Sequence, residues 1–193
     1  DEEHRFGVKQ KDSIQEFNKS HKLSLTATPI PRSLNMALSK LRQLSIMSSP
    51  PKQRLPILTF VHEENDSIVK NALEREIHRG GQAYIVYNDV KSIDQVHKKL
   101  AKLCPHIQFG TVHGQMPVTA IEKQMARFHS QAFQVLIAST IIESGLDVAN
   151  ANTIIIYRAD KLGLAQLHQI RGRVGRSHHQ AYAYLLTPQS ELG

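Results

Sequence analysis

Short apolar segments alternate with amphipathic segments through most of this chain. Six apolar segments predict β-strands at 57–61, 83–87, 107–112, 135–139, 153–156 and 181–186. Four amphipathic segments between them predict helices at 67–79, 93–103, 118–128 and 164–174. Strands such as VLIA and TIII are apolar throughout, as is typical of parallel strands covered on both faces. The pattern predicts an α/β fold with a doubly wound, mostly parallel sheet and helices on both faces, whose ligands bind at the carboxyl ends of the strands.

The segment 48–56 separates this region from the first part of the chain. It reads SSPPKQRLP and holds three of the 8 prolines, which interrupt regular structure. We therefore expect two domains, 1–49 and 50–193. Within the first domain the sequence predicts helices at 12–19 and 33–41 and a short buried strand at 23–26.

Charge and cysteine content narrow the possible functions. Lys and Arg number 24 against 17 Asp and Glu, and the formal net charge of +7 favours a polyanionic partner. The single cysteine, Cys104, excludes an internal disulfide and a zinc site of clustered cysteines, and it favours a reduced, cytoplasmic setting. We expect neither a membrane span nor a signal peptide, because no segment has the required apolar length or pattern.

The stretch 163–180, GLAQLHQIRGRVGRSHHQ, is the densest candidate site. Three arginines and two glycines fall within six residues: Arg171, Gly172, Arg173, Gly175 and Arg176. Glycine lets the backbone approach a ligand closely, and the planar, permanently charged guanidinium group binds phosphoryl oxygens through paired hydrogen bonds. A solvated basic helix end is the alternative. Together with Gln169, however, the cluster favours a site for a polyphosphate.

Polar clusters also follow three of the predicted strands, at 88–89, 113–115 and 140–147. The last reads TIIESGLD and follows a strand that is apolar throughout. Thr140 is able to donate to a phosphate, and Asp147 is able to accept from a ribose hydroxyl. A helix cap followed by a glycine turn explains the same residues equally well, so both interpretations stay open.

An acidic cluster, DEEH, occupies residues 1–4. Carboxylates such as Asp1 and Glu2 at the end of a buried strand are suited to holding Mg²⁺ through water and polarising an attacking water, although a solvated terminus explains the cluster as simply. The loop 26–32 contains two prolines and leaves Thr26 and Thr28 at a strand end. Because the sequence starts on this cluster without a methionine, we expect it to be a piece of a larger protein.

These motifs resemble, in the same order, those of the superfamily 2 helicases and translocases. DEEH resembles motif II, TATPIPR motif III, HGQM and TIIESGLD motifs IV and V, and QIRGRVGR motif VI. Longer stretches, including DEEHRFG, GGQAYIVYNDV and GLAQLHQIRGRVGRSHHQAYAYLLTP, resemble the family of bacterial transcription-repair coupling factors across essentially the whole chain. RecG-like branched-DNA helicases, which share TATPIPR and GLAQLHQ, are the alternative family.

The resemblance implies a role for each matching position. Asp1 would help to hold Mg²⁺, Glu2 would activate the attacking water, and Arg173 and Arg176 would be arginine fingers with Gln169 beside them. The other implied roles are nucleotide binding for Gly145, Asp147 and Gly172, coupling of nucleotide and DNA for Thr26 and Thr28, and DNA binding for His113, Gly114 and Thr140. Ser144, Leu146 and Tyr157 depart from the family pattern but leave the hydroxyl, glycine and carboxylate of motif V in place.

The phosphate-cradling motif G-x-x-x-x-G-K-[ST] does not occur in the sequence. The resemblance therefore implies that 1–49 is the tail of a first RecA-like lobe and 50–193 a second lobe, without ATPase activity of its own. The parent would use ATP and Mg²⁺ to move along double-stranded DNA, displace stalled RNA polymerase and couple transcription to nucleotide excision repair. RNA polymerase and the repair protein UvrA would be partners through modules outside this chain.

Two other classes of function are compatible with an α/β sheet. A dinucleotide-binding dehydrogenase would need G-x-G-x-x-G between a strand and a helix, and the sequence has none. A non-catalytic nucleic-acid-binding module stays open, since the chain is basic and lacks the phosphate cradle.

Overall fold

The computed structural model describes residues 45, 55–139 and 148–189. The chain divides into two units, Asp1–Ser49 and Pro50–Gly193, and apart from Ser45 all described residues belong to the second. The helices and the strand predicted before residue 45 lie outside the described residues. Within the described ranges, no helix is both long and apolar enough to cross a membrane.

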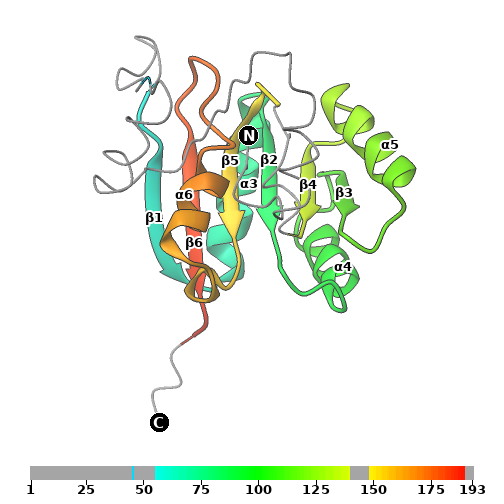
Figure 1. Ribbon diagram of the computed structural model, residues 1–193, viewed down its shortest axis with the longest axis horizontal. Coiled ribbons are helices and arrows are strands. Elements are labelled where there is room, and N and C mark those ends of the chain that lie inside the picture. Colours follow the sequence, from blue (N-terminus) through cyan, green and yellow to red (C-terminus); the bar gives the residue numbers. More distant parts are fainter. Residues whose placement is uncertain (1–44, 46–54, 140–147, 190–193) are drawn as a thin grey trace, which may run out of the picture. The chain divides into compact units, whose positions relative to one another are not determined.

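All six strands and all four helices predicted within the described region are present (Figure 1). The strands are β1 (Leu58–Glu63), β2 (Gln82–Val86), β3 (Phe109–Val112), β4 (Val135–Ala138), β5 (Ala151–Ile156) and β6 (Tyr182–Thr187). The helices are α3 (Asp66–His78), α4 (Ile93–Leu103), α5 (Val118–His129) and α6 (Leu164–Arg171), with a short 3₁₀ helix, η3 (Ala159–Lys161). Helix α6 is three residues shorter than predicted.

The six strands form one sheet in the order β1-β6-β5-β2-β4-β3, and every neighbouring pair is parallel (Figure 1). The prediction of a mostly parallel, doubly wound sheet is thus confirmed. Strands β1 and β3 are the edges of this sheet. Consecutive strands are not neighbours in it at three places: β6 and β5 lie between β1 and β2, β4 lies between β2 and β3, and β2 lies between β4 and β5.

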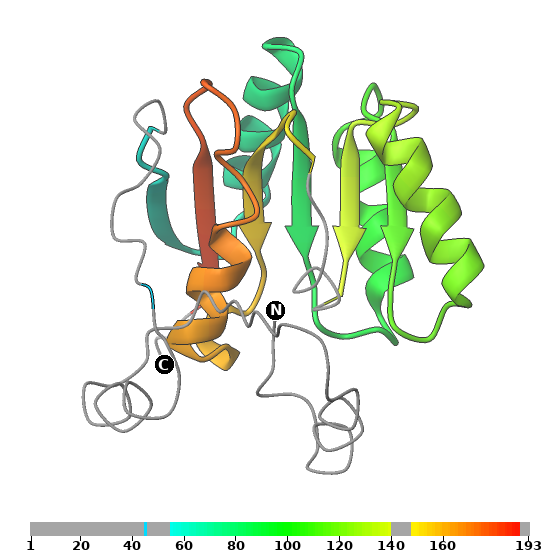
Figure 2. The same cartoon turned by 45° about the horizontal axis from the view of Figure 1, so that its top comes forward.

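Two apolar cores, one on each face of the sheet, are built from alternate residues of the same strands. Tyr84 and Val86 of β2 pack with α5 and α6, whereas Ala83 and Ile85 of the same strand pack with α3 and α4. Figure 2 shows the two pairs of helices on opposite faces. The central strands β2, β4 and β5 are buried along their whole length, which explains their uninterrupted apolar sequences.

The path of each connection decides which edge of the sheet a loop reaches. Because β5 and β6 are parallel, α6 between them runs antiparallel to both. The helix begins near the carboxyl ends of the strands and ends near their amino ends. The connection 172–181 is therefore at the amino edge of the sheet, the edge at which the strands begin.

Candidate functional site

Residues 172–180, here called the arginine loop, connect α6 to β6. The loop begins with a helix cap: the Gly172 N–H donates to the His168 oxygen at 3.0 Å. Two further turns follow, because the N–H groups of Arg173 and Val174 donate to the Ile170 and Arg171 oxygens. Gly172 and the left-handed Gly175 end the helix at Arg171, three residues before the predicted end.

Gly175 forms the sharp turn of the arginine loop. Its φ is +76°, a conformation that favours glycine, and an ideal Cβ there would lie 3.1 Å from Ile57 Cγ1 and 3.2 Å from Ala181 Cβ. Val174, just before it, is fully buried. The turn is therefore fixed against the chain segments that enter β1 and β6.

The three arginines of the stretch have different surroundings. Arg171 is at the end of α6, where its Nη2 donates to His168 Nδ1 at 3.0 Å and its Nη1 lies 3.4 Å from Thr59 Oγ1. Arg173 is half-buried, and Arg176 is exposed. Arg171 thus holds α6 to β1, while Arg173 and Arg176 lie on either side of the fixed Gly175 turn.

Two side chains hold the end of the arginine loop. Ser177 Oγ donates to Asn152 Oδ1 at 2.7 Å, and Gln180 Nε2 donates to the Pro56 oxygen at 2.6 Å. Asn152 is 1% exposed, so the serine is anchored to a buried residue of β5. The sequence analysis did not single out Asn152 or Ser177, because a hydrogen bond between positions 25 residues apart leaves no local pattern.

The structure places Gln169 near the end of α6, and Gly172, Arg173 and Arg176 in the arginine loop that follows it. Gln169 is half-buried in the last turn of α6, and its backbone oxygen would lie 3.4 Å from a Cβ on Gly172. The sequence analysis expected ligands at the carboxyl ends of the strands, and this expectation stays a prediction, whereas the arginine loop lies at the other edge of the sheet. The physical reason is the antiparallel course of α6, which places its C-terminal end at the opposite edge.

His113 and Gly114 do follow the carboxyl end of a strand, β3. The His113 oxygen accepts from the Met116 N–H at 3.0 Å, and Gly114 is exposed. In the described part of the chain, the buried Nδ1 of His113 has no hydrogen-bond partner. These two predicted DNA-binding residues are therefore separated from the arginine loop by the length of the sheet.

The remaining predicted site residues lie outside the described residues: Asp1, Glu2, Thr26, Thr28, Thr140, Gly145 and Asp147. The segment 140–147 is preceded by Ser139, at the carboxyl end of β4, and followed by the buried Val148. Among the residues that the structure does describe, no group of three or more His, Cys, Asp or Glu could hold a metal ion. A metal ion at this site would therefore need ligands other than the described residues.

Tyr157, which departs from the family pattern, belongs to the core. It is 3% exposed and contacts Tyr87 edge-on, with ring centroids 5.7 Å apart. Burial, with a smaller contribution from the carboxylates of Glu64 and Asp66, raises the pKa of the Tyr157 hydroxyl far above its ordinary value. The residue is neutral in the physiological range and serves packing.

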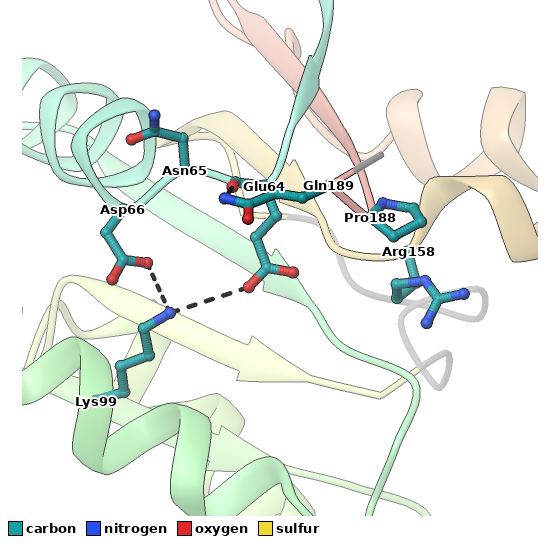
Figure 3. Close-up of a pocket in the computed structure, with 7 residues that line it drawn as sticks. All are labelled: Glu64, Asn65, Asp66, Lys99, Arg158, Pro188 and Gln189. Atoms are coloured by element: carbon teal, nitrogen blue, oxygen red, sulfur yellow. Dashed lines mark hydrogen bonds and ion pairs between the residues drawn. The ribbon is translucent and has the colours of Figure 1, made fainter. Parts of the chain in front are cut away.

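A hollow of about 530 Å³ lies beside the carboxyl ends of β1, β5 and β6 (Figure 3). It is lined by Glu64, Asn65, Asp66, Lys99, Arg158, Pro188 and Gln189. Lys99 Nζ lies 2.6 Å from Asp66 Oδ1 and 3.9 Å from Glu64 Oε1, so its charge is compensated within the hollow. None of the predicted site residues lines it, and its carboxylates do not suit a phosphate.

Known proteins share this sequence and this fold. The family model "Helicase conserved C-terminal domain" matches residues 64–178. The transcription-repair-coupling factor of Haemophilus influenzae is 56% identical over 193 residues, which are all of this chain and 17% of that protein. The transcription-repair-coupling factor of Escherichia coli is 56% identical over 189 residues, 97% of this chain and 16% of that protein. The chain therefore spans about a sixth of the length of these relatives.

A solved structure of RecG bound to a three-way DNA junction has the same fold, with a TM-score of 0.72. It is 34% identical and covers 84% of this chain and 22% of the RecG chain. The six-stranded parallel sheet with helices on both faces is thus the RecA-like α/β fold of helicase lobes. Because the family model covers more than half of the chain, including most of the arginine loop, the chain belongs to the helicase conserved C-terminal domain family.

Proposed function

We propose that this chain is a motor fragment of an ATP-dependent translocase on double-stranded DNA. Residues 50–193 form the second motor lobe, and residues 1–49 belong to the end of the first. The observation that carries the proposal is the fixed turn at Gly175, which holds two arginines at the same edge of a helicase C-terminal fold. The identity to two transcription-repair-coupling factors supports it.

The arginine loop acts on a nucleotide held mainly by the first lobe. ATP, when bound, supplies the phosphoanhydride bond whose hydrolysis drives movement. Arg173 and Arg176 hold the phosphoryl oxygens and neutralise the charge that develops on them, as arginine fingers do. Gln169 and Gly172 lie at the end of α6 where the loop begins, and the exposed position of Arg176 allows it to reach a ligand outside its own lobe.

DNA binds at the opposite edge of the sheet, where His113 and Gly114 follow β3. Contacts to phosphates there are independent of sequence and weaken with salt. The three central strands that run between the two edges are fully buried, so the lobe moves as one body when the nucleotide state changes. Movement triggered at the arginine loop is thereby transmitted to the DNA.

Residues outside the described part complete the proposed machinery. Asp1 helps to hold Mg²⁺ and Glu2 activates the attacking water, while Thr26 and Thr28 couple the two sites. Thr140 contacts DNA. Gly145 and Asp147 contact the nucleotide. Because the sequence lacks the phosphate-cradling motif, the isolated chain should not hydrolyse ATP.

Because the relatives are transcription-repair-coupling factors, the proposal also covers the activity of the whole protein. In a bacterial cytoplasm, the intact motor displaces stalled RNA polymerase and couples transcription to excision repair, with RNA polymerase and UvrA as partners through other modules. A RecG-like helicase is the second candidate, because the RecG structure shares this fold at 34% identity. An assay of stalled RNA polymerase displacement, run beside an assay of branched-DNA unwinding, distinguishes the two candidate functions.

The arginine-finger role is tested by Arg176→Ala in the full-length protein. We expect DNA-stimulated ATP turnover to fall by roughly 10³-fold or more, while nucleotide binding is largely kept. Arg127→Ala is the matched control, because Arg127 is exposed on α5, where its guanidinium packs over the Phe133 ring. Turnover of Arg176→Ala near that of the control would contradict the proposal.

A further inference from the structure

The end of α3 lies against the end of the arginine loop, and Arg79 bridges them. Its Nη1 donates to the Gln180 backbone oxygen at 2.7 Å, and its Nη2 donates to Glu76 Oε2. Because the Gln180 side chain donates to the Pro56 oxygen at 2.6 Å, Gln180 is fixed from two separate elements. The guanidinium group also lies 5.2 Å from the Tyr182 ring centroid, over the start of β6.

Glu76 is the residue that orients Arg79. Its side chain is 0% exposed and also accepts from Thr153 Oγ1 at 2.5 Å. An ideal Cβ on Gly81 would lie 1.8 Å from Glu76 Oε1, so glycine at that position leaves room for the carboxylate. A buried ion pair is weak evidence for stability, since apolar residues of similar volume often serve as well. The pair is therefore better explained by the orientation that it gives to Arg79.

A second set of hydrogen bonds ties α3 to the residue after Arg176. The Gly80 oxygen accepts from Asn150 Nδ2 at 3.0 Å, and the Asn150 oxygen accepts from Asn152 Nδ2 at 3.2 Å. Asn152 Oδ1 then accepts from Ser177 Oγ at 2.7 Å. The end of α3 thus holds the arginine loop at two points, Ser177 and Gln180, three residues apart.

Buried polar side chains concentrate around these two ties. In the described part of the chain, the buried polar side chains are Glu76, Gln82, Ser139, Asn152 and Thr153. All except Ser139 lie at the amino edge, in the last turn of α3 or in the first residues of β2 and β5. Buried polar groups are costly unless paired, so their arrangement specifies the geometry of this edge.

We propose that Glu76 and Arg79 are positioning residues for Arg176, acting together with the Asn152–Ser177 tie. The inference rests on the proposed function of the arginine loop. An arginine that stabilises phosphoryl transfer has to be held close to its productive position, and a shift of about 1 Å is able to cost roughly 10²-fold in rate. Glu76 fixes Arg79, Arg79 fixes Gln180, and the loop between Gly175 and Gln180 is left with little freedom.

A lysine substitution separates this role from a purely structural one. In Arg79→Lys, a positive charge stays beside the buried Glu76. A single ammonium group, however, does not reproduce the two guanidinium nitrogens that bond to Glu76 and to Gln180. Arg75→Lys is the matched control on the same helix. Arg75 stacks 3.7 Å from the Tyr182 ring centroid and donates to Tyr184 Oη at 2.6 Å, so these contacts are with β6 and not with the arginine loop.

The experiment measures DNA-stimulated ATP turnover, the KM for ATP and thermal unfolding in the full-length protein. We expect Arg79→Lys to lower kcat by about 10- to 100-fold with KM for ATP within about twofold, and Arg75→Lys to leave kcat within about twofold. Added to Arg176→Ala, Arg79→Lys should change turnover no further, because it acts through that arginine. Ser177→Ala, which breaks the second tie, should lower kcat by a smaller factor.

Each outcome bears on a different part of the inference. The positioning role is overturned, while the arginine-finger role stands, if Arg79→Lys turns over ATP within about twofold of wild type. It is also overturned if Arg79→Lys lowers turnover by the same factor in the Arg176→Ala background as in wild type. If Arg79→Lys fails to fold, the positioning role is tested by Ser177→Ala, and normal ATP turnover in that variant overturns it. Near-normal turnover in Arg176→Ala overturns both the proposed function and the inference.

Discussion

The two edges of the sheet are built from different kinds of interaction. At the amino edge, the arginine loop is held by a left-handed glycine, by a hydrogen bond to the buried Asn152 and by a hydrogen bond from Arg79, which is paired with the buried Glu76. At the carboxyl edge, the charged groups around the hollow, including Lys99 and Asp66, are about half exposed and pair with one another in solvent. Buried interactions are screened little, so the amino edge should be rigid and the carboxyl edge adaptable.

This difference agrees with the work proposed for each edge. A catalytic arginine needs a fixed position, whereas a surface that tracks DNA phosphates has to accept any sequence. Substitutions at the amino edge should therefore cost much more stability and activity than chemically similar substitutions at the carboxyl edge. Pairs of matched changes, one at each edge, test the comparison directly.

Two glycines, one in the turn of the arginine loop and one at the start of α6, give the largest expected contrast. Gly175→Ala should lower the free energy of unfolding by about 2–4 kcal/mol, since a left-handed φ costs a side chain about 1–3 kcal/mol and overpacking against Ile57 and Ala181 adds a similar amount. ATP turnover of the full-length protein should fall as well, because Arg176 follows directly. Urea unfolding of the chain measures the first effect.

Gly163→Ala is the control at the opposite end of the same helix. No atom lies within 4 Å of the position that a Cβ on Gly163 would take, and its φ of −67° suits any residue. The change in unfolding free energy should stay within about 0.5 kcal/mol. Equal effects of the two substitutions would contradict the distinction between a rigid and an adaptable edge.

Thr153→Val removes one hydrogen bond from the buried Glu76 and almost no volume. The Glu76 carboxylate keeps its pairing with Arg79 but loses its second hydrogen-bond donor, so the free energy of unfolding should fall by about 1–3 kcal/mol. Thr59→Val on the exposed edge strand is the control for burial, because both hydrogen bonds of the Thr59 hydroxyl, to the Ile57 oxygen at 3.3 Å and from Arg171 Nη1 at 3.4 Å, are exposed to solvent. Thermal unfolding of both variants is the measurement, and a smaller effect at Thr153 would contradict the ranking.

Most of the fold was predictable from the sequence, because its helices and strands have clear local patterns. All six strands and four helices predicted after residue 56 are present, and the resemblance to the helicase family is confirmed. The predicted and observed elements differ at their ends. Strand β3 begins at Phe109 and not at 107, because the Ile107 N–H donates to the Cys104 oxygen in the turn after α4. Strand order was not predictable, since it depends on pairing between distant segments.

The candidate site was predictable only where chemistry is local in sequence. The arginines and glycines of motif VI form one dense cluster, from which the sequence alone predicts a phosphate site. Arg79 and Gln180 are 101 residues apart, and Glu76 and Thr153 are 77 apart, so no spacing links them. The edge of the sheet at which the arginine loop lies was not predicted, because it depends on the course of α6 across the sheet.

The ion pair in the hollow should contribute little to stability. Lys99→Met removes the cation between Asp66 and Glu64, each of which is at least a third exposed. We expect a change in unfolding free energy of about 0–1 kcal/mol that decreases further with added salt. Urea unfolding at low and high salt is the measurement. A loss as large as that of Thr153→Val would show that the carboxyl edge is as tightly specified as the amino edge.

The smallest effect should be a pH dependence at the carboxyl edge. Asp89, in the loop after β2, accepts from Ser92 Oγ at 2.6 Å and from the Lys91 N–H at 3.0 Å, and these bonds hold its pKa below the ordinary value of 3.8. A carboxylate with a lowered pKa stabilises the fold above its unfolded-state pKa, and this contribution is lost as the pH falls through the lower value. The melting temperature of wild type should therefore exceed that of Asp89→Asn slightly at pH 7, and the difference should shrink below about pH 4. A difference that stays constant over this range would mean that shape, and not charge, holds this loop.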